Sequence, residues 1–254
     1  MITDTDAIVL RQVKTVNGRR MLLLFSQKYG KISVGSNLTE SGKNKTALVQ
    51  RPFTYGHYEL FKGRESYNLN RGQVIKSYYG IGEDLDKYMA ASYVLELTEK
   101  LLADELPQQG MFRLLLEFLD ALERRSRRHE TLVEAYIVKV IALLGTMPQM
   151  DVCSVCGKAG ANRYFSVEEG GMLCADCARQ HMQRPDKETL IYDTNFDIVT
   201  ILKYLQKESF RAFEKIALEE EIVKKLHAIL KSWLAYHFGV EKLKSEAFLL
   251  YQQT

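Results

Sequence analysis

The chain has 254 residues, which is enough for two or three small domains. Its 46% hydrophobic content can supply a buried core, and the 26% charged residues with only 4 prolines exclude an extended disordered chain. The N-terminus begins with acidic residues and lacks the basic start and apolar run of a signal peptide. The apolar stretch around Tyr136–Leu144 is too short to cross a bilayer, so we expect a cytoplasmic protein without a membrane segment.

Charge is distributed unevenly along the chain. Residues 1–80 contain 13 Lys and Arg against 5 Asp and Glu, a net of +8, whereas residues 81–150 contain 8 against 12, a net of −4. This segregation favours a nucleic-acid surface on the first segment and protein contacts on the rest. A basic surface that serves solubility alone is the alternative.

Short apolar or alternating runs predict strands throughout the first part of the chain. Turn residues separate the runs, for example Val16-Asn-Gly-Arg, and no long helical pattern interrupts them. Such a pattern is typical of a small closed barrel, and an OB-type Greek-key barrel that binds oligonucleotides is the expected fold of residues 1–80. The predicted strands are 7–10, 21–25, 31–34, 53–61 and 73–79.

Apolar residues recur at helical spacing after Gly82, which predicts a helical domain over residues 81–150. A further long helix carries Trp233 on its apolar face and ends at Gly239. We expect the C-terminal helices, within residues 183–254, to pack on the helical domain. The predicted fold class is therefore α+β and multidomain: an OB-fold β-barrel, then an α-helical body with an insert at residues 151–182.

The insert contains every cysteine of the chain. Two C-x-x-C pairs, Cys153/Cys156 and Cys174/Cys177, are separated by 17 residues, which is the spacing of a two-knuckle zinc finger. Four thiolates complete the tetrahedron that zinc prefers and leave no position for a reactive water, so we expect one structural zinc ion. A redox C-x-x-C pair and two disulfides are the alternatives, and His181 could substitute for one ligand.

Basic residues interleaved with aromatic ones make the first segment a candidate for binding single-stranded nucleic acid. Cations neutralise phosphates, and exposed rings stack on bases of any kind. Alternation along Phe53, Tyr55 and Phe61 favours instead that half or more of the rings fill the barrel core. The candidate DNA-binding residues are Arg11, Lys14, Arg19, Arg20, Lys28, Lys31, Lys43, Lys45 and Arg51.

No constellation of catalytic residues is evident, and we expect a protein that is not an enzyme. The loop that ends in Ser41-Gly-Lys-Asn is too long for a P-loop, and Asn44 stands where a P-loop has the Ser or Thr that binds magnesium. No His-x-Glu motif precedes the cysteines, as it does in zinc deaminases. Four further cations have two open interpretations, a second DNA contact or favourable charges at a helix C-terminus. They are Arg124, Arg125, Arg127 and Arg128.

Several motifs resemble the bacterial recombination mediator RecO family. The chain contains Leu23-Leu-Phe-Ser-Gln-Lys-Tyr-Gly-Lys-Ile-Ser, Pro52-Phe-Thr, Cys153-x-x-Cys-Gly and Gly170-Gly-Met-Leu-Cys-x-x-Cys, in the order found in that family. The resemblance extends over nearly the whole chain. One departure is the stretch Gly35-Ser-Asn-Leu-Thr-Glu-Ser, where family members have a basic run.

The resemblance implies a DNA repair and homologous recombination function. Members of this family bind single- and double-stranded DNA and anneal complementary strands without ATP. The implied partners are DNA, RecR, the C-terminal tail of single-stranded-DNA-binding protein (SSB) and, indirectly, RecA, in a cytoplasmic, nucleoid-associated protein. The alternative from another class is a zinc-stapled interaction adaptor with only incidental nucleic-acid affinity.

Overall fold

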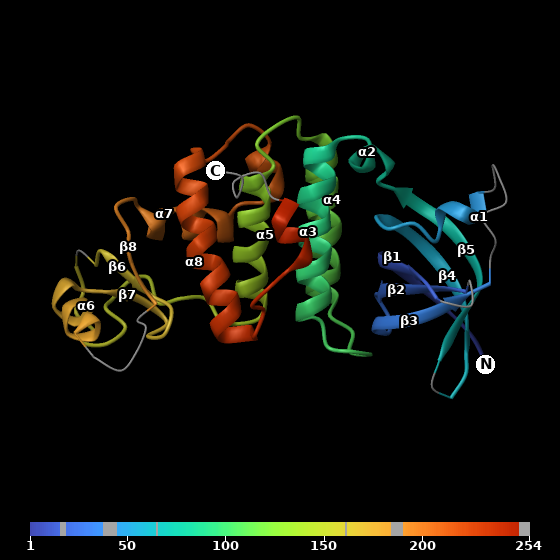
Figure 1. Ribbon diagram of the computed structural model, residues 1–254, viewed down its shortest axis with the longest axis horizontal. Helices are drawn as coiled ribbons and strands as arrows, with labels where there is room; N and C mark the ends of the chain where they lie inside the picture. The colour runs from blue at the N-terminus through green and yellow to red at the C-terminus, as the bar shows by residue number, and fades with distance from the viewer. Residues whose placement is uncertain (16–18, 38–44, 65, 161, 184–189, 249–254) are drawn as a thin grey trace. The chain divides into compact units, whose positions relative to one another are not determined.

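The computed structural model describes residues 1–15, 19–37, 45–64, 66–160, 162–183 and 190–248 (Figure 1). Contacts between residues divide the chain into two compact units: among the described residues, the first comprises residues 1–125 with 247–248, and the second comprises residues 126–246. The first unit contains a barrel and helices, and the second contains helices and a small sheet. The division into four domains, residues 1–80, 81–150, 151–182 and 183–254, stays a prediction.

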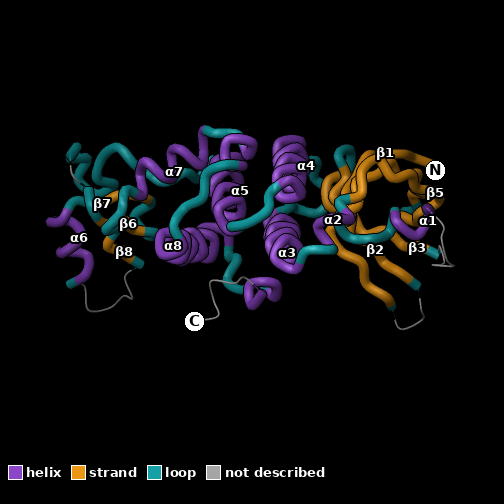
Figure 2. The backbone as a smooth tube through the Cα atoms, turned by 90° about the horizontal axis from the view of Figure 1, so that it is seen from above, coloured by secondary structure: helices purple, strands orange, loops and turns teal. Residues whose placement is uncertain are grey.

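Five strands of the first unit form a closed barrel, which Figure 2 shows from above. Their order around the barrel is β1-β2-β3-β5-β4. Neighbouring strands are antiparallel except β3 and β5, which run parallel where Val34 faces Tyr67 and Gly35 faces Asn68. This order is the Greek key of the OB fold, and the predicted fold class is confirmed. The strands are β1 (Ile2–Lys14), β2 (Arg20–Ser26), β3 (Gly30–Ser36), β4 (Thr54–Lys62) and β5 (Tyr67–Ser77).

Alternating residues of these strands fill the barrel, because successive side chains of a strand point to opposite faces. The short helix α1 (Lys45–Leu48) leads to Val49, which is buried among them, and the hydroxyl of Tyr58 donates a hydrogen bond of 2.8 Å to the Val49 carbonyl. The buried cluster consists of Ala7, Val9, Leu22, Leu24, Ile32, Val34, Val49, Tyr58, Leu60, Tyr67 and Leu69.

Helices α2 (Tyr79–Gly82), α3 (Leu85–Leu101) and α4 (Gln109–Arg124) complete the first unit. Asp84 caps α3 by accepting hydrogen bonds from the backbone N–H groups of Asp86 and Lys87. Phe112 of α4 packs against barrel residues, with its ring centroid 5.3 Å from that of Phe25 and 6.0 Å from that of Tyr55. The barrel and these helices therefore share apolar contacts.

The loop between α3 and α4 lies against the start of β3. The backbone N–H of Glu105 donates to the carbonyl of Lys31 at 3.0 Å. Gly30 has a φ of 70°, and a Cβ there would overlap the backbone carbonyl of Leu106. Glycine is needed here because only a residue without a side chain can take this conformation so close to another backbone.

The second unit is built around α5 (Glu130–Leu143), which is buried over most of its length and packs against α7 and α8. Gly239 ends α8 in the left-handed conformation, with a φ of 68°, as its sequence position predicts. No helix within the described ranges is long and apolar enough to cross a membrane. The remaining elements are β6 (Tyr164–Ser166), β7 (Gly171–Leu173), α6 (Ala175–Met182), β8 (Ile191–Asp193), α7 (Ile198–Lys207), η1 (Phe210–Glu214), α8 (Glu220–Phe238) and η2 (Lys244–Phe248).

Candidate metal centre and nucleic-acid interface

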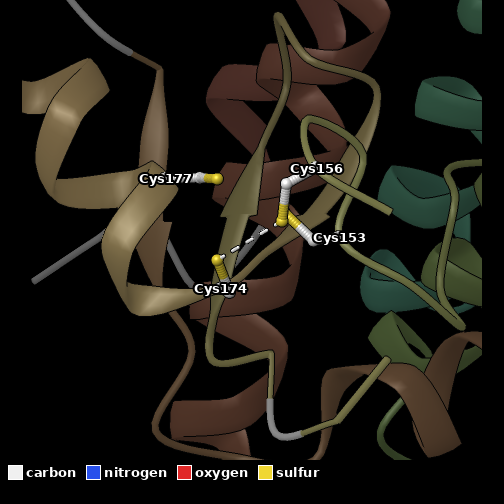
Figure 3. A group of neighbouring side chains, drawn as sticks. All are labelled: Cys153, Cys156, Cys174 and Cys177. Carbon is white, nitrogen blue, oxygen red and sulfur yellow. Dashed lines mark hydrogen bonds between the residues drawn. The ribbon is translucent and has the colours of Figure 1, made fainter. Parts of the chain in front are cut away.

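The four cysteines come together in space, as Figure 3 shows. Cys153 and Cys156 lie in a turn, Cys174 is the N-cap of α6, and Cys177 lies in its first turn. Their four Sγ atoms all lie within 4.8 Å of one another, and those of Cys156 and Cys174 are 3.9 Å apart. Tetrahedral zinc with bonds of about 2.3 Å would place its sulfur ligands about 3.8 Å apart. The arrangement therefore fits one shared metal ion.

None of the four cysteines forms a disulfide in the structure. The turn after Cys153 closes through a 2.8 Å hydrogen bond from the N–H of Gly157 to the Cys153 carbonyl. Burial disfavours ionisation of the Cys153 thiol, but backbone N–H groups, first that of Cys156 and then that of Cys174, donate to its sulfur and lower its pKa to about 6. This thiol therefore ionises more readily than an ordinary cysteine, whereas the pKa of the Cys177 thiol is raised to about 12, first by its hydrogen bond with Cys174.

His181 is not a member of the cysteine cluster. It is buried in α6, and its Nδ1 lies 3.2 Å from a carboxylate oxygen of Glu169, in the loop between β6 and β7. Among the described residues, the only group of potential ligands close enough to share a metal is that of the four cysteines. The contact between His181 and Glu169 therefore joins α6 to the β6–β7 hairpin.

Contacts join the cysteine segment to α8. The ring of Phe165 in β6 lies 5.7 Å from that of Trp233, and the hydroxyl groups of Tyr192 and Ser232 are 2.5 Å apart. The imidazole Nε2 of His237 donates to the carbonyl of Val167 at 3.1 Å. Loss of order around the cysteines would therefore remove partners from one face of α8.

Two of the predicted DNA-binding residues are engaged within the first unit. Arg11 forms a two-pronged ion pair with Glu99 of α3, with nitrogen–oxygen distances of 2.9 and 3.2 Å. The ammonium of Lys31 lies 3.0 Å from the backbone carbonyl of Glu99 and 3.2 Å from a carboxylate oxygen of Asp104. These cations fasten the barrel to α3 and the loop after it.

Four predicted residues, Lys14, Arg19, Lys28 and Arg51, are exposed on the barrel, and Arg20 is half-buried. Lys43 lies outside the described residues, and Lys45 is described only by its backbone, in α1. Three more exposed cations, omitted from the predicted set, follow β4 or lie in β5: Lys62, Arg64 and Arg71. Within the described ranges, none of these seven exposed cations forms a salt bridge.

Four of the seven exposed cations lie at two hairpin loops. Lys14 and Arg19 flank the β1–β2 loop, and Lys62 and Arg64 flank the β4–β5 loop. Arg19 donates a hydrogen bond to the side chain of Asn68 and covers Gly35, at the place where β3 and β5 pair. In OB folds that bind oligonucleotides, the loops between strands 1 and 2 and between strands 4 and 5 contact the ligand.

Most of the aromatic residues serve the core rather than the surface. Phe53, Tyr58 and Tyr67 are buried, and Tyr55 packs against the helices of the same unit. Phe61 is exposed, with 52% of its surface accessible. Charge and not ring stacking is therefore the main feature of this candidate interface.

The cluster at the end of α4 lies at a helix C-terminus. Arg124 belongs to the last turn, and Arg125 is the C-cap, buried and bonded through its N–H to the carbonyls of Ala121 and Leu122. Arg128 has a φ of 54° and donates to the carbonyl of Leu218 at 3.4 Å. This position suits cations that oppose the partial negative charge of helix carbonyls.

The chain is a multidomain protein with an OB-type barrel, a helical body and a four-cysteine cluster. Comparison with known protein families shows to which family it belongs. The family model described as Recombination protein O N terminal matches residues 1–78, and Recombination protein O C terminal matches residues 82–247. The chain belongs to the RecO family.

Curated relatives cover nearly the full length of the chain. The DNA repair protein RecO of Pelotomaculum thermopropionicum is 31% identical over 246 residues, which are 96% of this chain and 92% of the relative. That of Caldanaerobacter subterraneus subsp. tengcongensis is 28% identical over 97% of this chain and 96% of the relative. That of Thermoanaerobacter sp. is 27% identical over 98% of this chain and 97% of the relative.

Proposed function

We propose that this protein is a mediator of DNA repair and homologous recombination. It binds single- and double-stranded DNA, anneals complementary strands without ATP and, with RecR, helps to load RecA onto strands coated by SSB, whose C-terminal tail it contacts. Membership of the RecO family supports this function. The structural observation that carries it is the group of exposed cations at the β1–β2 and β4–β5 loops.

Annealing of this kind requires no catalytic residue. Ammonium and guanidinium groups screen the repulsion between two polyanionic strands and raise their local concentration, and base pairing supplies the driving force. Contacts to phosphates carry no sequence information, so strands can shift until their bases match. If about five of the exposed cations each neutralise one phosphate, affinity for single strands falls with salt with a log–log slope of about −3.5.

The metal in this account is a single structural zinc ion. Cys153, Cys156, Cys174 and Cys177 would hold it, and four sulfur ligands leave no position at which it could activate water. Bound zinc supplies a cross-link within the segment. The residues around it then hold α6 and the β6–β7 hairpin against α8. The protein acts without turnover, in the cytoplasm and in association with the nucleoid.

The double variant Lys14→Ala/Arg19→Ala tests the interface. Loss of two phosphate contacts is expected to reduce the magnitude of the salt slope by about 1.4 and to weaken binding equally for all sequences. Annealing of two labelled complementary oligonucleotides without ATP, with and without SSB, should slow in parallel. The control Lys207→Ala/Lys215→Ala removes the same charge from exposed positions of the second unit.

Three results would contradict the proposal. If the wild-type protein fails to accelerate annealing at every salt concentration of the series, a zinc-stapled interaction adaptor is the better description of the protein. If the control variant loses as much affinity as Lys14→Ala/Arg19→Ala, net charge and not the loop surface determines binding. A change in sequence preference would show that the loop reads bases.

A further inference from the structure

Five side chains from four segments meet at one end of the barrel. Lys28 and Tyr29 come from the turn between β2 and β3, Lys62 from the end of β4, Tyr67 from the start of β5 and Thr3 from the start of β1. We call this group the Tyr29 cluster. It lies beside the β4–β5 loop of the candidate DNA interface, because Lys62 and Tyr67 flank that loop.

The ring of Tyr29 is the centre of the cluster. The ammonium nitrogen of Lys28 lies 5.4 Å from its centroid and that of Lys62 lies 5.3 Å from it, while Lys62 is also 5.2 Å from the centroid of Tyr67. The two rings are 5.8 Å apart, and the Tyr29 hydroxyl shares a hydrogen bond with that of Thr3. Two exposed cations therefore share one anchored ring.

Electrostatics agree with this geometry. The pKa of the Tyr29 phenol is lowered, first by the hydrogen bond with Thr3, against the opposing effect of burial, and then by Lys28 and Lys62. The pKa of the Lys62 ammonium is raised, first by a hydrogen bond to Tyr67, and the carboxylate of Glu105 adds to the effect. The Lys62 ammonium therefore keeps its charge at neutral pH.

We propose that Lys28 and Lys62 form a clamp for the phosphodiester backbone of DNA and that Tyr29 is the positioning residue that holds both ammonium groups. This assignment rests on the proposed function. Each ammonium can donate three hydrogen bonds, and within the described residues neither forms a salt bridge that a phosphate would have to displace. A phosphate is therefore the matching ligand.

The ring serves the clamp and does not stack on a base. Its hydroxyl is bonded to Thr3, Tyr67 lies beside it, and the two ammonium groups occupy positions over it. A lysine that is held before binding loses less side-chain freedom when it meets its ligand, which improves affinity without a new contact. The predicted role of Tyr29 thus differs from the base stacking of other single-strand-binding surfaces.

The test compares two probes of equal length, a labelled oligothymidylate and a strand in which every base is replaced by an abasic site. Binding is measured by fluorescence anisotropy across a salt series. Lys28→Ala/Lys62→Ala is expected to reduce the magnitude of the salt slope by about 1.4 on both probes, since each lost contact contributes about 0.7. Tyr29→Leu is expected to weaken binding of both probes by about fivefold.

Two further variants separate positioning from a general loss of structure. Tyr29→Phe keeps the ring and is expected to retain most of the affinity. Tyr29→Leu should add little to the loss in the Lys28→Ala/Lys62→Ala background, because its effect passes through these lysines. Lys207→Ala/Lys215→Ala again controls for charge, and thermal unfolding controls for folding.

Unchanged salt slopes in Lys28→Ala/Lys62→Ala would overturn the clamp. Tyr29→Leu that weakens binding of oligothymidylate but not of the abasic strand would show base stacking and would overturn the positioning role. Wild-type protein that binds neither probe would contradict the proposed function itself, so the two failures are distinct.

Discussion

Cys174→Ser is expected to abolish metal binding at the four-cysteine centre and to disorder the segment around it. A serine hydroxyl stays protonated at neutral pH and cannot replace a thiolate. The local core cannot compensate, because two of its four buried residues, Cys153 and Cys177, are themselves proposed ligands. Structural zinc supplies on the order of 10 kcal/mol of apparent folding free energy in isolated fingers, far more than this small core can.

The loss should extend beyond the cysteines, because Phe165 and Val167 contact Trp233 and His237 of α8. We expect the zinc content of the purified variant to fall to near zero and its unfolding temperature to fall by on the order of 10 °C. Elemental analysis and calorimetry measure the two effects. The control is Ser154→Ala, in the turn between Cys153 and Cys156, where the hydroxyl has no hydrogen-bond partner among the described residues.

Normal zinc content and normal thermal stability in Cys174→Ser would show that the cysteines do not form a structural metal site. If Ser154→Ala loses as much stability as Cys174→Ser, the turn rather than the metal is what the segment depends on. Either result would require a different role for the cluster.

Glu134→Ala is expected to destabilise the second unit by about 3–5 kcal/mol. Glu134 of α5 is fully buried, and its carboxylate oxygen lies 2.9 Å from Nδ1 of His227 in α8, which is also buried. Removal of the carboxylate takes away the hydrogen-bond partner of the buried His227 Nδ1 and opens a cavity between the helices. Chemical denaturation, followed by a probe of the second unit, measures the loss.

Two variants complete this experiment. Glu134→Leu/His227→Leu is expected to recover most of the stability, because two apolar side chains replace the pair without an isolated polar group. Glu221→Ala removes the carboxylate of an exposed pair with Lys225, at 2.8 Å, and should cost less than about 1 kcal/mol. Equal losses in Glu134→Ala and Glu221→Ala would contradict the importance assigned to burial.

Sequence periodicity predicted the barrel well where strands are apolar and less well where they are polar. Strands β2 and β3, which contain Leu22 and Ile32, are confirmed close to their predicted bounds. β5 begins at Tyr67 and not at Gln73, because its first half, Tyr67-Asn-Leu-Asn, contains two asparagines that resemble loop residues. Pairing with β3 and β4 supplies the hydrogen bonds that make this stretch a strand.

In the candidate DNA interface, residue type alone does not show which cations are available to bind DNA. Arg11 and Lys31 have the same charge as Lys28, but only contacts with α3 and the loop after it show that they are engaged within the protein. The predicted set of DNA-binding residues does not include Lys62 and Arg64, although both are basic residues of the first segment. They become candidates once the β4–β5 hairpin is seen to carry them.

The sequence by itself determined the four cysteines of the cluster as candidate metal ligands, the OB-type barrel, the helical body and the family. Each of these follows from local spacing: the C-x-x-C pairs, strand and helix periodicity, and short motifs. Only the tertiary structure decided which cations are exposed, and it alone brought Thr3, Tyr29 and Lys62 together. Ion pairing and burial depend on side chains far apart in the chain, such as Arg11 and Glu99, and the folded backbone alone places these side by side.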